Sequence, residues 1–245
     1  MTTTKSKRRR QARASILIVI GLIALFLVFN KFSKLRPAFI FPRWKDYQVY
    51  GVDISRHQGE IDWYQLKAHE VKFAFMKASE GEKLQDIQFE NNWSMAKEVG
   101  IARGAYHFYR PNLDWKIQAR NFISNVELEK GDLPPVLDIE LIHNSDQKYL
   151  LTEIKKWLEV VEKHYGVKPI VYTYENYYNR FLLDEFRGYN LWIAKYNYNS
   201  PQLEDGAHWE FWQYSESGEL KGIDEKVDLN CFYGTKEQFR RILKK

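Results

Sequence analysis

Cysteine is almost absent from this chain of 245 residues, because Cys231 is the only one. An intrachain disulfide is therefore excluded, and the fold must be held by the packing of a sequence that is 44% hydrophobic. Cys231 lies in no metal-ligand spacing, and the six histidines form no H-E-x-x-H or similar motif. The sequence predicts no cofactor and no metal site, although a site built from Asp and Glu alone stays open.

The motifs of two further chemistries are also missing. The chain has neither a glycine-rich phosphate loop nor the G-x-S-x-G elbow of serine hydrolases. The closeness of His57 to Ser55 and Asp53 in the sequence is therefore no sign of a catalytic triad. We also find no internal repeat and no low-complexity segment beyond the basic N-terminal tail.

Acidic residues are missing from the first 45 positions, which carry 11 Lys and Arg residues. The other 200 residues hold 26 basic and 32 acidic side chains, so the overall net charge of +5 conceals a net charge of −6 in this larger part. The basic charge belongs to the tail, and the remainder shows no stripe of Arg and Lys. We therefore expect no nucleic-acid partner.

An apolar run follows the basic tail. Residues 14–32 are predicted to form a transmembrane or signal-anchor helix, although its uncharged stretch is short for a span. The positive-inside rule then leaves residues 1–13 in the cytoplasm and puts the acidic domain, 47–245, on the extracytoplasmic side, in the periplasm or at the cell surface. Residues 33–46 become a tether. A cleaved signal peptide and a buried soluble helix are the alternatives, but no small-x-small cleavage site follows the apolar run.

Short apolar runs alternate with amphipathic stretches along the rest of the chain, which is typical of an α/β fold. Eight such strands predict a single, irregular (β/α)8-like barrel that lacks some helices near its end, where 197–208 and 215–225 read as loops. An open doubly wound sheet is the alternative. The strands are expected at 49–55, 72–79, 103–110, 134–140, 169–174, 191–196, 209–214 and 226–230, and the helices at 62–70, 85–99, 114–127, 146–166 and 176–187.

Nearly every strand begins apolar and becomes polar at its C-terminal end. In a parallel barrel these ends share one face, and that face carries the active site, so we expect one shared cleft. Polar residues that only cap loops are the alternative. The strand-end residues are Asp53, Ser55, Lys77, Ser79, Tyr106, His107, Asp138, Glu140, Tyr172, Tyr174, Lys195, Tyr196, Gln213 and Asp228.

The stretch PPVLDIE, residues 134–140, ends a buried-type run with two carboxylates. Asp138 and Glu140 point to one side of an extended strand, and Leu137 and Ile139 point to the other. If the apolar pair packs against helices, both carboxyl groups face the barrel axis. By the same argument, Asp53 faces the barrel axis, and Val52 and Ile54 point outward.

Four carboxylates would converge if Asp228 joins the others from the last strand. Only Lys77 and Lys195 are candidate cations nearby, so at least one pKa should be raised, which suits a general acid near neutral pH. A structural salt-bridge network is the alternative. Carboxylates beside aromatic rings suit glycosidic cleavage, in which one group protonates the departing oxygen and another stabilises or attacks the oxocarbenium-like centre.

The strand motifs resemble those of the glycoside hydrolase family 25 lysozymes, the Chalaropsis-type N-acetylmuramidases. The likeness runs from about residue 48 to 235 in family order. It implies a flattened α/β barrel that cleaves the β-1,4 bond between N-acetylmuramic acid and N-acetylglucosamine in peptidoglycan. The matching pieces are GVDISRHQGEIDW (51–63), FAFMKASEG (73–81), GAYHFYRP (104–111), PVLDIE (135–140), IVYTY (170–174), LWIAKY (191–196), WEFWQYSESGELKGID (209–224) and VDLN (227–230).

By position, the resemblance implies that Glu140 is the catalytic acid and that Asp138 steadies the 2-acetamido group of the substrate or acts as base. The resemblance does not decide whether the nucleophile is the acetamide oxygen of the substrate or an enzyme carboxylate. The side chains of Asp138 and Glu140 can lie within roughly 5–7 Å on an extended strand, nearer the separation of retaining than of inverting enzymes, and we favour retention with substrate assistance. The other residues expected at the site are Asp53 and Asp228 as supporting carboxylates and Tyr106, Tyr172, Gln213 and Trp192 as substrate-binding residues.

Two other functions stay open. The cleft could hold peptidoglycan without cleaving it, although a degenerate binder would tend to have lost Asp138 or Glu140. The strand motifs also allow hydrolysis of another N-acetylhexosamine polymer such as chitin. The predicted anchor and the lack of a wall-binding repeat favour work on the cell's own wall, with membrane and glycan strand as partners and no protein partner evident.

Overall fold

The computed structural model describes residues 47–140, 147–197 and 199–245. The predicted cytoplasmic tail, transmembrane helix and tether, 1–46, lie outside the described residues. Within the described ranges, no helix is both long enough and apolar enough to span a membrane.

Eight strands close into a barrel in the described part of the chain. The order is β1-β9-β8-β7-β6-β5-β4-β2, and pairing of β1 with β2 completes the ring. This arrangement confirms the predicted barrel and excludes the open doubly wound sheet. The strands are β1 (Val49–Ile54), β2 (Phe73–Glu80), β4 (Ala102–Phe108), β5 (Val136–Asp138), β6 (Ile170–Tyr174), β7 (Asn190–Ala194), β8 (Phe211–Gly218) and β9 (Val227–Phe232); the short β3 (Leu84–Gln85) pairs only with β2.

Strand β9 runs against its neighbours. It pairs antiparallel with both β1 and β8, whereas the other pairs around the barrel are parallel. The start of β9 therefore lies at the C-terminal ends of the other strands. The uniform parallel direction assumed from the sequence was wrong for this strand, because residues 219–226 return the chain beside β8 as a hairpin.

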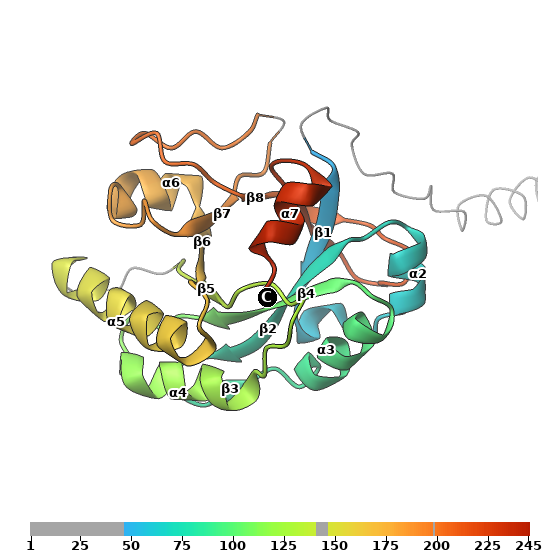
Figure 1. Ribbon diagram of the computed structural model, residues 1–245, viewed down its shortest axis with the longest axis horizontal. Coiled ribbons are helices and arrows are strands. Elements are labelled where there is room, and N and C mark those ends of the chain that lie inside the picture. Colours follow the sequence, from blue (N-terminus) through green and yellow to red (C-terminus); the bar gives the residue numbers. More distant parts are fainter. Residues whose placement is uncertain (1–46, 141–146, 198) are drawn as a thin grey trace, which may run out of the picture. The chain divides into compact units, whose positions relative to one another are not determined.

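The helices cover the outside of the barrel (Figure 1). The stripe predicted on the longest helix is confirmed, because its Leu150, Ile154, Trp157, Leu158 and Val161 are all buried. Four elements were not predicted: the short η1 (Arg56–Gln58), β3, the extension of β8 into the predicted loop 215–225, and the terminal helix α7. The helices are α2 (Trp63–Ala68), α3 (Phe89–Glu98), α4 (Trp115–Asn125), α5 (Gln147–Tyr165), α6 (Glu175–Tyr177), which continues into η2 (Tyr178–Leu182), and α7 (Lys236–Ile242).

Two apolar layers follow from the alternation of side chains along the strands. Leu137 and Ile139 pack outward with the helices, as the parity argument predicted, whereas Val136 belongs to a second cluster inside the barrel. The inner cluster consists largely of aromatic rings, and the ring of Phe75 stacks on that of Trp192 with centroids 4.3 Å apart. The half of the barrel nearer the N-terminal ends of its parallel strands is therefore a packed core and not a pore.

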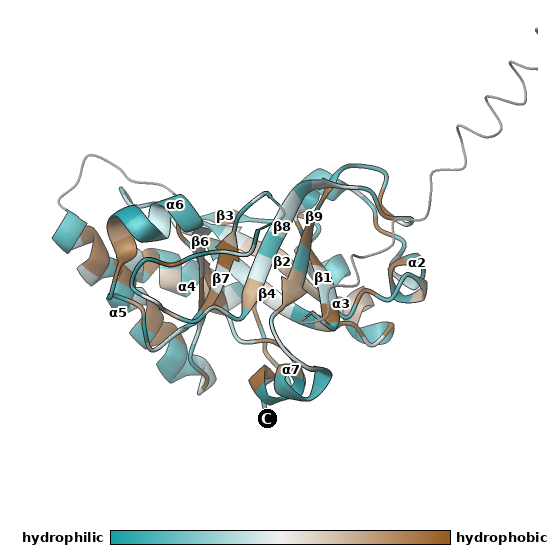
Figure 2. Cartoon of the chain, turned by 90° about the horizontal axis from the view of Figure 1, so that it is seen from above, coloured by the Kyte–Doolittle hydropathy of each residue, from teal (hydrophilic) through white to brown (hydrophobic). Residues whose placement is uncertain are grey.

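Glycine and helix α7 complete this inner packing. A Cβ on Gly51 would lie 2.5 Å from the carbonyl oxygen of Phe73, so the close approach of β1 to β2 requires glycine there. Helix α7 lies below the strands in Figure 2, and its Phe239 packs against Phe73 and Phe232 with ring centroids 5.6 and 5.4 Å apart. Phe239 thus closes the N-terminal end of the barrel, and the opposite end stays available for a site.

Candidate active site

A cavity of about 280 Å³ lies among the C-terminal ends of the parallel strands. Its lining includes every residue predicted for the site: Asp53, Tyr106, Asp138, Glu140, Tyr172, Trp192, Gln213 and Asp228. Seven of these residues lie on seven different strands, and Glu140 lies two residues after Asp138, the last residue of β5. The shared cleft expected from the strand ends is therefore present.

Not every polar strand-end residue faces this cavity. His107 is fully buried on the outer side of β4, where its Nδ1 lies 2.8 Å from Ser79 Oγ and its ring stacks on Trp157. Burial lowers the pKa of His107 to about 4, so the imidazole is neutral at pH 7. Lys195 turns away to an ion pair with Glu175 at 2.8 Å. Parity along each strand decides which polar side chains reach the axis.

Asp53 and Asp228 form the first carboxyl pair. They are directly opposite each other in the antiparallel pairing of β1 with β9, so their side chains share one face. Burial raises the pKa of Asp53 to about 6, and burial together with the nearby charge of Asp53 raises the pKa of Asp228 to about 9. A hydrogen bond joins the two carboxyl groups, so protonated Asp228 donates to ionised Asp53 near neutral pH.

Two amides hold Asp53 in place. Gln213 Nε2 donates to Asp53 Oδ1 at 2.8 Å, and Asn230 Nδ2 donates to the same oxygen at 2.7 Å. Each amide is fixed in turn, because Trp192 Nε1 donates to Asn230 Oδ1 at 2.8 Å and the hydroxyls of Tyr172 and Tyr196 donate to Gln213 Oε1 at 2.8 and 2.9 Å. This network orients Asp53 and occupies both the amide nitrogen and the amide oxygen of Gln213 with hydrogen bonds inside the protein.

Asn230 was not predicted, although the sequence carried a signal for it. It lies two residues after Asp228, so it has the same parity in the strand. Its side chain is fully buried, and a buried amide needs hydrogen-bond partners. The partners, Asp53 and Trp192, come from strands far away in the sequence, so only the closed barrel reveals them.

Asp138 and Glu140 form the second carboxyl pair, which differs from the first. Asp138 is buried, and its Oδ1 has no hydrogen-bond partner within the described part of the chain. Burial, followed by the charge of Glu140, raises the pKa of Asp138 well above its usual range. Burial also raises the pKa of Glu140, although the nearby hydroxyls of Tyr174 and Tyr172 oppose that shift. The pair therefore favours holding a proton, as a general acid requires.

Lys77 provides positive charge beside this pair. It lines the cavity, and its charge lowers the pKa of both Asp138 and Glu140. Its Nζ lies 2.5 Å from Glu80 Oε2 and 4.9 Å from the centre of the Phe108 ring. Glu80 also pairs with Arg110, so one carboxylate joins two cations. Lys77 is thus held at the wall and moderates the acidity of the carboxyl pair without neutralising it.

The family model of glycosyl hydrolases family 25 matches residues 52–223, which is most of the barrel. The chain belongs to this family. It is therefore a glycoside hydrolase, and the cavity with the two carboxyl pairs is its candidate active site. The match ends before β9, so Asp228 and Asn230 enter the site on the evidence of the structure.

Individual relatives agree with the family assignment. An uncharacterised protein of Escherichia coli (strain K12), YegX, is 40% identical over 80% of this chain and 74% of its own length. Lysozyme M1 of Streptomyces globisporus is 34% identical over 76% of this chain and 68% of its own. The structure of a family 25 glycosyl hydrolase from Bacillus anthracis matches with a TM-score of 0.76 and 36% identity, over 82% of this chain and 95% of that one.

Aromatic side chains occupy two levels of this family 25 cavity. Trp192 is 2% exposed and lies at the floor, 4.3 Å from the ring of Tyr172 between centroids. Tyr196 is 39% exposed, and its ring meets the edge of Tyr174 with centroids 6.2 Å apart. The rings at the rim can meet a sugar, whereas the floor mainly supports the carboxyl network.

Two strand-end aromatic residues lie elsewhere. Trp212 and Tyr214 pack in the outer apolar layer, because they have the opposite parity to Gln213 in β8. Both side chains are part of the hydrophobic core and do not contact the cavity. No group of His, Cys, Asp and Glu side chains among the described residues has the arrangement of a metal site.

Proposed function

We propose that the barrel hydrolyses the β-1,4 bond between N-acetylmuramic acid and N-acetylglucosamine in peptidoglycan. The observation that carries the proposal is the Asp138–Glu140 pair, whose raised pKa values leave a proton available in a chain that belongs to the family 25 hydrolases. Relatives named Lysozyme M1 and Autolytic lysozyme support the choice of peptidoglycan as substrate.

Glu140 is the proposed general acid. As the bond between the anomeric carbon and the glycosidic oxygen breaks, the Glu140 carboxyl gives its proton to the departing oxygen. The 2-acetamido oxygen of the substrate donates its electron pair to the anomeric carbon, so an oxazolinium ring forms. Water then attacks the anomeric carbon from the face that the leaving group occupied, opposite the acetamido oxygen, and gives its proton to Glu140. The ring opens, and the configuration at the anomeric carbon is retained.

Asp138 is the proposed partner of the acetamido group. Its unpartnered Oδ1 can accept a hydrogen bond from the acetamido N–H. That bond favours ionised Asp138 and leaves the shared proton on Glu140, which needs it for the leaving group. The buried carboxylate also stabilises the positive charge that develops as the ring closes.

The remaining predicted site residues take supporting roles in this proposal. Asp53 and Asp228 keep the floor of the cavity negative with one proton between them, and Gln213 positions Asp53. Tyr106, Tyr172 and Trp192 shape the wall and floor that the sugar contacts, and the more exposed Tyr174 and Tyr196 offer rings for stacking.

Product analysis tests the proposed bond. The full chain is incubated with peptidoglycan, and the new reducing ends are reduced with borohydride and identified. Reduced muramic acid is the expected product. Reduced glucosamine would contradict the muramidase assignment, cleavage of chitin alone would assign another N-acetylhexosamine polymer, and tight binding without new ends would assign a binding module.

Residues 14–32 are the proposed membrane anchor, with 1–13 in the cytoplasm, 33–46 as a tether and the barrel domain, 47–245, on the extracytoplasmic side. The support is the sequence pattern of basic tail and apolar run. N-terminal sequencing of the mature chain tests retention of the segment, and protease treatment of spheroplasts tests the side on which the barrel lies. A new N-terminus after residue 30 would establish a cleaved signal peptide.

A further inference from the structure

The end of the barrel opposite to the cavity carries a basic helix. Residues 236–245 contain five basic side chains and one acidic side chain. Lys236, Arg240, Arg241 and Lys245 are exposed, and only Arg241 forms an ion pair within the described residues, with Glu237. We call these four cations, with Tyr233, the α7 face.

The helix is held firmly on this end. Phe239 inserts into the inner aromatic cluster, and the backbone of Lys244 bonds to the loop before β5: its N–H donates to Asp132 O at 2.8 Å and its carbonyl accepts from Gly131 N at 2.9 Å. The exposed cations therefore lie on a firmly packed helix, which keeps them at this end of the barrel.

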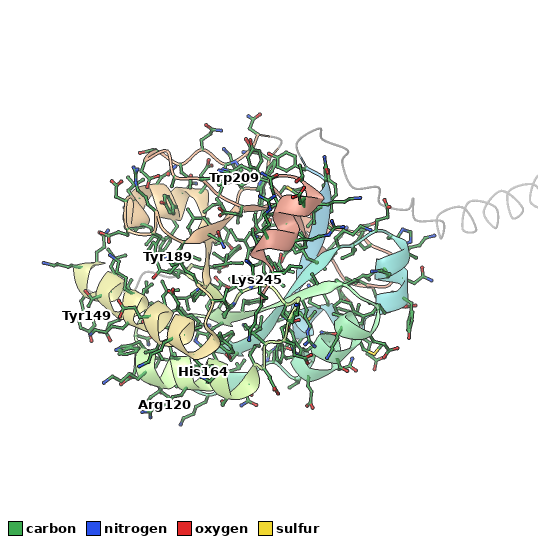
Figure 3. The ribbon with its side chains drawn as sticks, viewed as in Figure 1. Arg120, Tyr149, His164, Tyr189, Trp209 and Lys245 are labelled. Carbon is green, nitrogen blue, oxygen red and sulfur yellow. The ribbon has the colours of Figure 1, made fainter. Side chains whose placement is uncertain are left out.

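Aromatic residues border the basic helix where the chain enters the barrel. Tyr47 bridges to Gly234 just before β1, and its ring lies 5.8 Å from that of Tyr233 and 6.5 Å from that of Trp209 between centroids. Tyr233 is 43% exposed, whereas Trp209 is only 9% exposed and packs behind it; Figure 3 labels Trp209 and Lys245. An exposed tyrosine ring next to Lys and Arg is a composition that favours a membrane–water interface.

The cavity end has the opposite charge. Five carboxyl groups line the cavity, one of them from Glu216, and the segment 217–226 adds three acidic and two basic residues at the same end. An anionic surface therefore attracts the α7 end and repels the cavity end. The chain also enters β1 at the α7 end, because the N-terminal ends of β1 and β2 lie side by side there.

We propose that the α7 face docks on an anionic phospholipid bilayer and so directs the cavity away from the membrane. This inference rests on the proposed membrane anchor but not on the proposed chemistry. Basic side chains near an anionic bilayer each contribute to binding, and a tether raises their effective concentration at the surface. The cavity would then face the wall, where its polymeric substrate lies.

Site-specific labelling of the full chain in vesicles tests the docking. Lys245→Cys takes a fluorophore, since native Cys231 is buried and unreactive. Lys221→Cys, on the exposed loop at the cavity end, is the matched control. With a quencher on the lipid headgroups, we expect quenching at position 245 in phosphatidylglycerol vesicles, loss of that quenching at about 0.5 M salt, and little quenching at position 221.

Charge removal gives the second comparison. The variant Lys236→Gln/Arg240→Gln/Arg241→Gln should lower the docked-to-undocked ratio roughly a hundredfold, from about a factor of five for each cation. Removal of three cations at the cavity end, Lys83→Gln/Lys221→Gln/Lys226→Gln, should leave the ratio within about a factor of two. Unchanged hydrolysis of soluble peptidoglycan fragments by both variants would establish that the barrel is intact.

Each failure has a separate signature. Equal quenching at positions 245 and 221, or equal quenching in phosphatidylcholine and phosphatidylglycerol, would overturn the docking. A response to soluble poly(glycerol phosphate) but not to vesicles would overturn it in favour of a wall polymer. Failure of the full chain to float with either vesicle would instead refute the anchor, and absent hydrolysis with normal docking would refute the muramidase proposal.

Discussion

The two carboxyl pairs of the cavity lie in the same buried environment but are satisfied differently. Asp53 accepts hydrogen bonds from two amides and shares a proton with Asp228, whereas Asp138 Oδ1 has no partner in the described part of the chain. Protein contacts therefore satisfy the first pair, whereas one oxygen of the second pair, Asp138 Oδ1, is left without a hydrogen bond in the described part of the chain. Uncompensated buried groups are costly to stability, and a substrate can supply the missing contact.

The difference between the two pairs shows how carboxyl groups in one cavity can have separate roles. The satisfied pair has a fixed geometry and supports the floor. The unsatisfied pair has a high proton affinity and space in front of it, so it suits chemistry. The predictions that follow test whether the pairs are in fact unequal.

The largest expected effect belongs to Glu140→Gln. The amide keeps the size of the side chain but has no proton to give, so kcat on peptidoglycan should fall by about 10³-fold or more. The thermal unfolding midpoint should stay within a few degrees of wild type. The exposed Glu60→Gln, which lies outside the cavity lining, is the control and should keep full activity. Near-wild-type turnover of Glu140→Gln would assign the acid elsewhere.

Asp138→Asn should lower kcat by about 10²-fold, because the amide cannot stabilise the positive charge that develops on the acetamido group. The stability of the variant should depend less on pH than that of the wild type. The raised pKa of Asp138 means that its stabilising contribution is present at low pH and is lost as pH rises through the folded-state pKa. Calorimetry at pH 5 and pH 8 should therefore show that the variant loses less stability than wild type on this change. A uniform loss at both pH values would contradict the unsatisfied character of Asp138.

Gln213→Glu should lower kcat/KM by roughly tenfold through its effect on Asp53. The substitution removes the N–H that donates to Asp53 Oδ1 and adds a second anion next to it, so the pKa of Asp53 should rise above about 6. The acidic limb of the pH–rate profile should move upward as a result. The exposed Gln65→Glu controls for the added charge. A lower activity with an unshifted pH profile would mean that Gln213 acts only on substrate binding.

Asp228→Asn should have the smallest effect on activity, within about fivefold at pH 7, because the amide N–H can replace the proton that Asp228 shares with Asp53. Its effect should appear in stability at higher pH. A folded-state pKa of about 9 means that Asp228 favours the folded state below the unfolded value near 4 and that this contribution is lost as pH rises through 9. Unfolding midpoints between pH 6 and pH 10 should therefore decline less in the variant than in wild type.

Parity, order along the chain and the family resemblance together predicted much of the site. The alternation in PPVLDIE placed Asp138 and Glu140 inward and Leu137 and Ile139 outward, and all eight predicted residues line the cavity. His107 and Lys195 show the limit of the argument, since both are polar residues at strand ends and neither reaches the cavity. Their partners, Ser79 and Glu175, come from other elements, and single-strand patterns do not reveal them.

The sequence by itself determined the alternation of strands and helices, the shared parity of Asp138 and Glu140 and the position of polar residues at the strand ends, because period-two alternation and βα order are local properties of the chain. Closure of the sheet into a barrel, in place of an open sheet, was decided by the tertiary structure. Only the tertiary structure decided that β9 runs backward, that Asn230 and Gln213 hold Asp53, and that α7 closes the far end. These features depend on contacts between segments up to 177 positions apart, such as Asn230 with Asp53. The physical reason is that a hydrogen bond or a desolvation cost depends on what lies nearby in space, and only closure of the barrel brings those groups together.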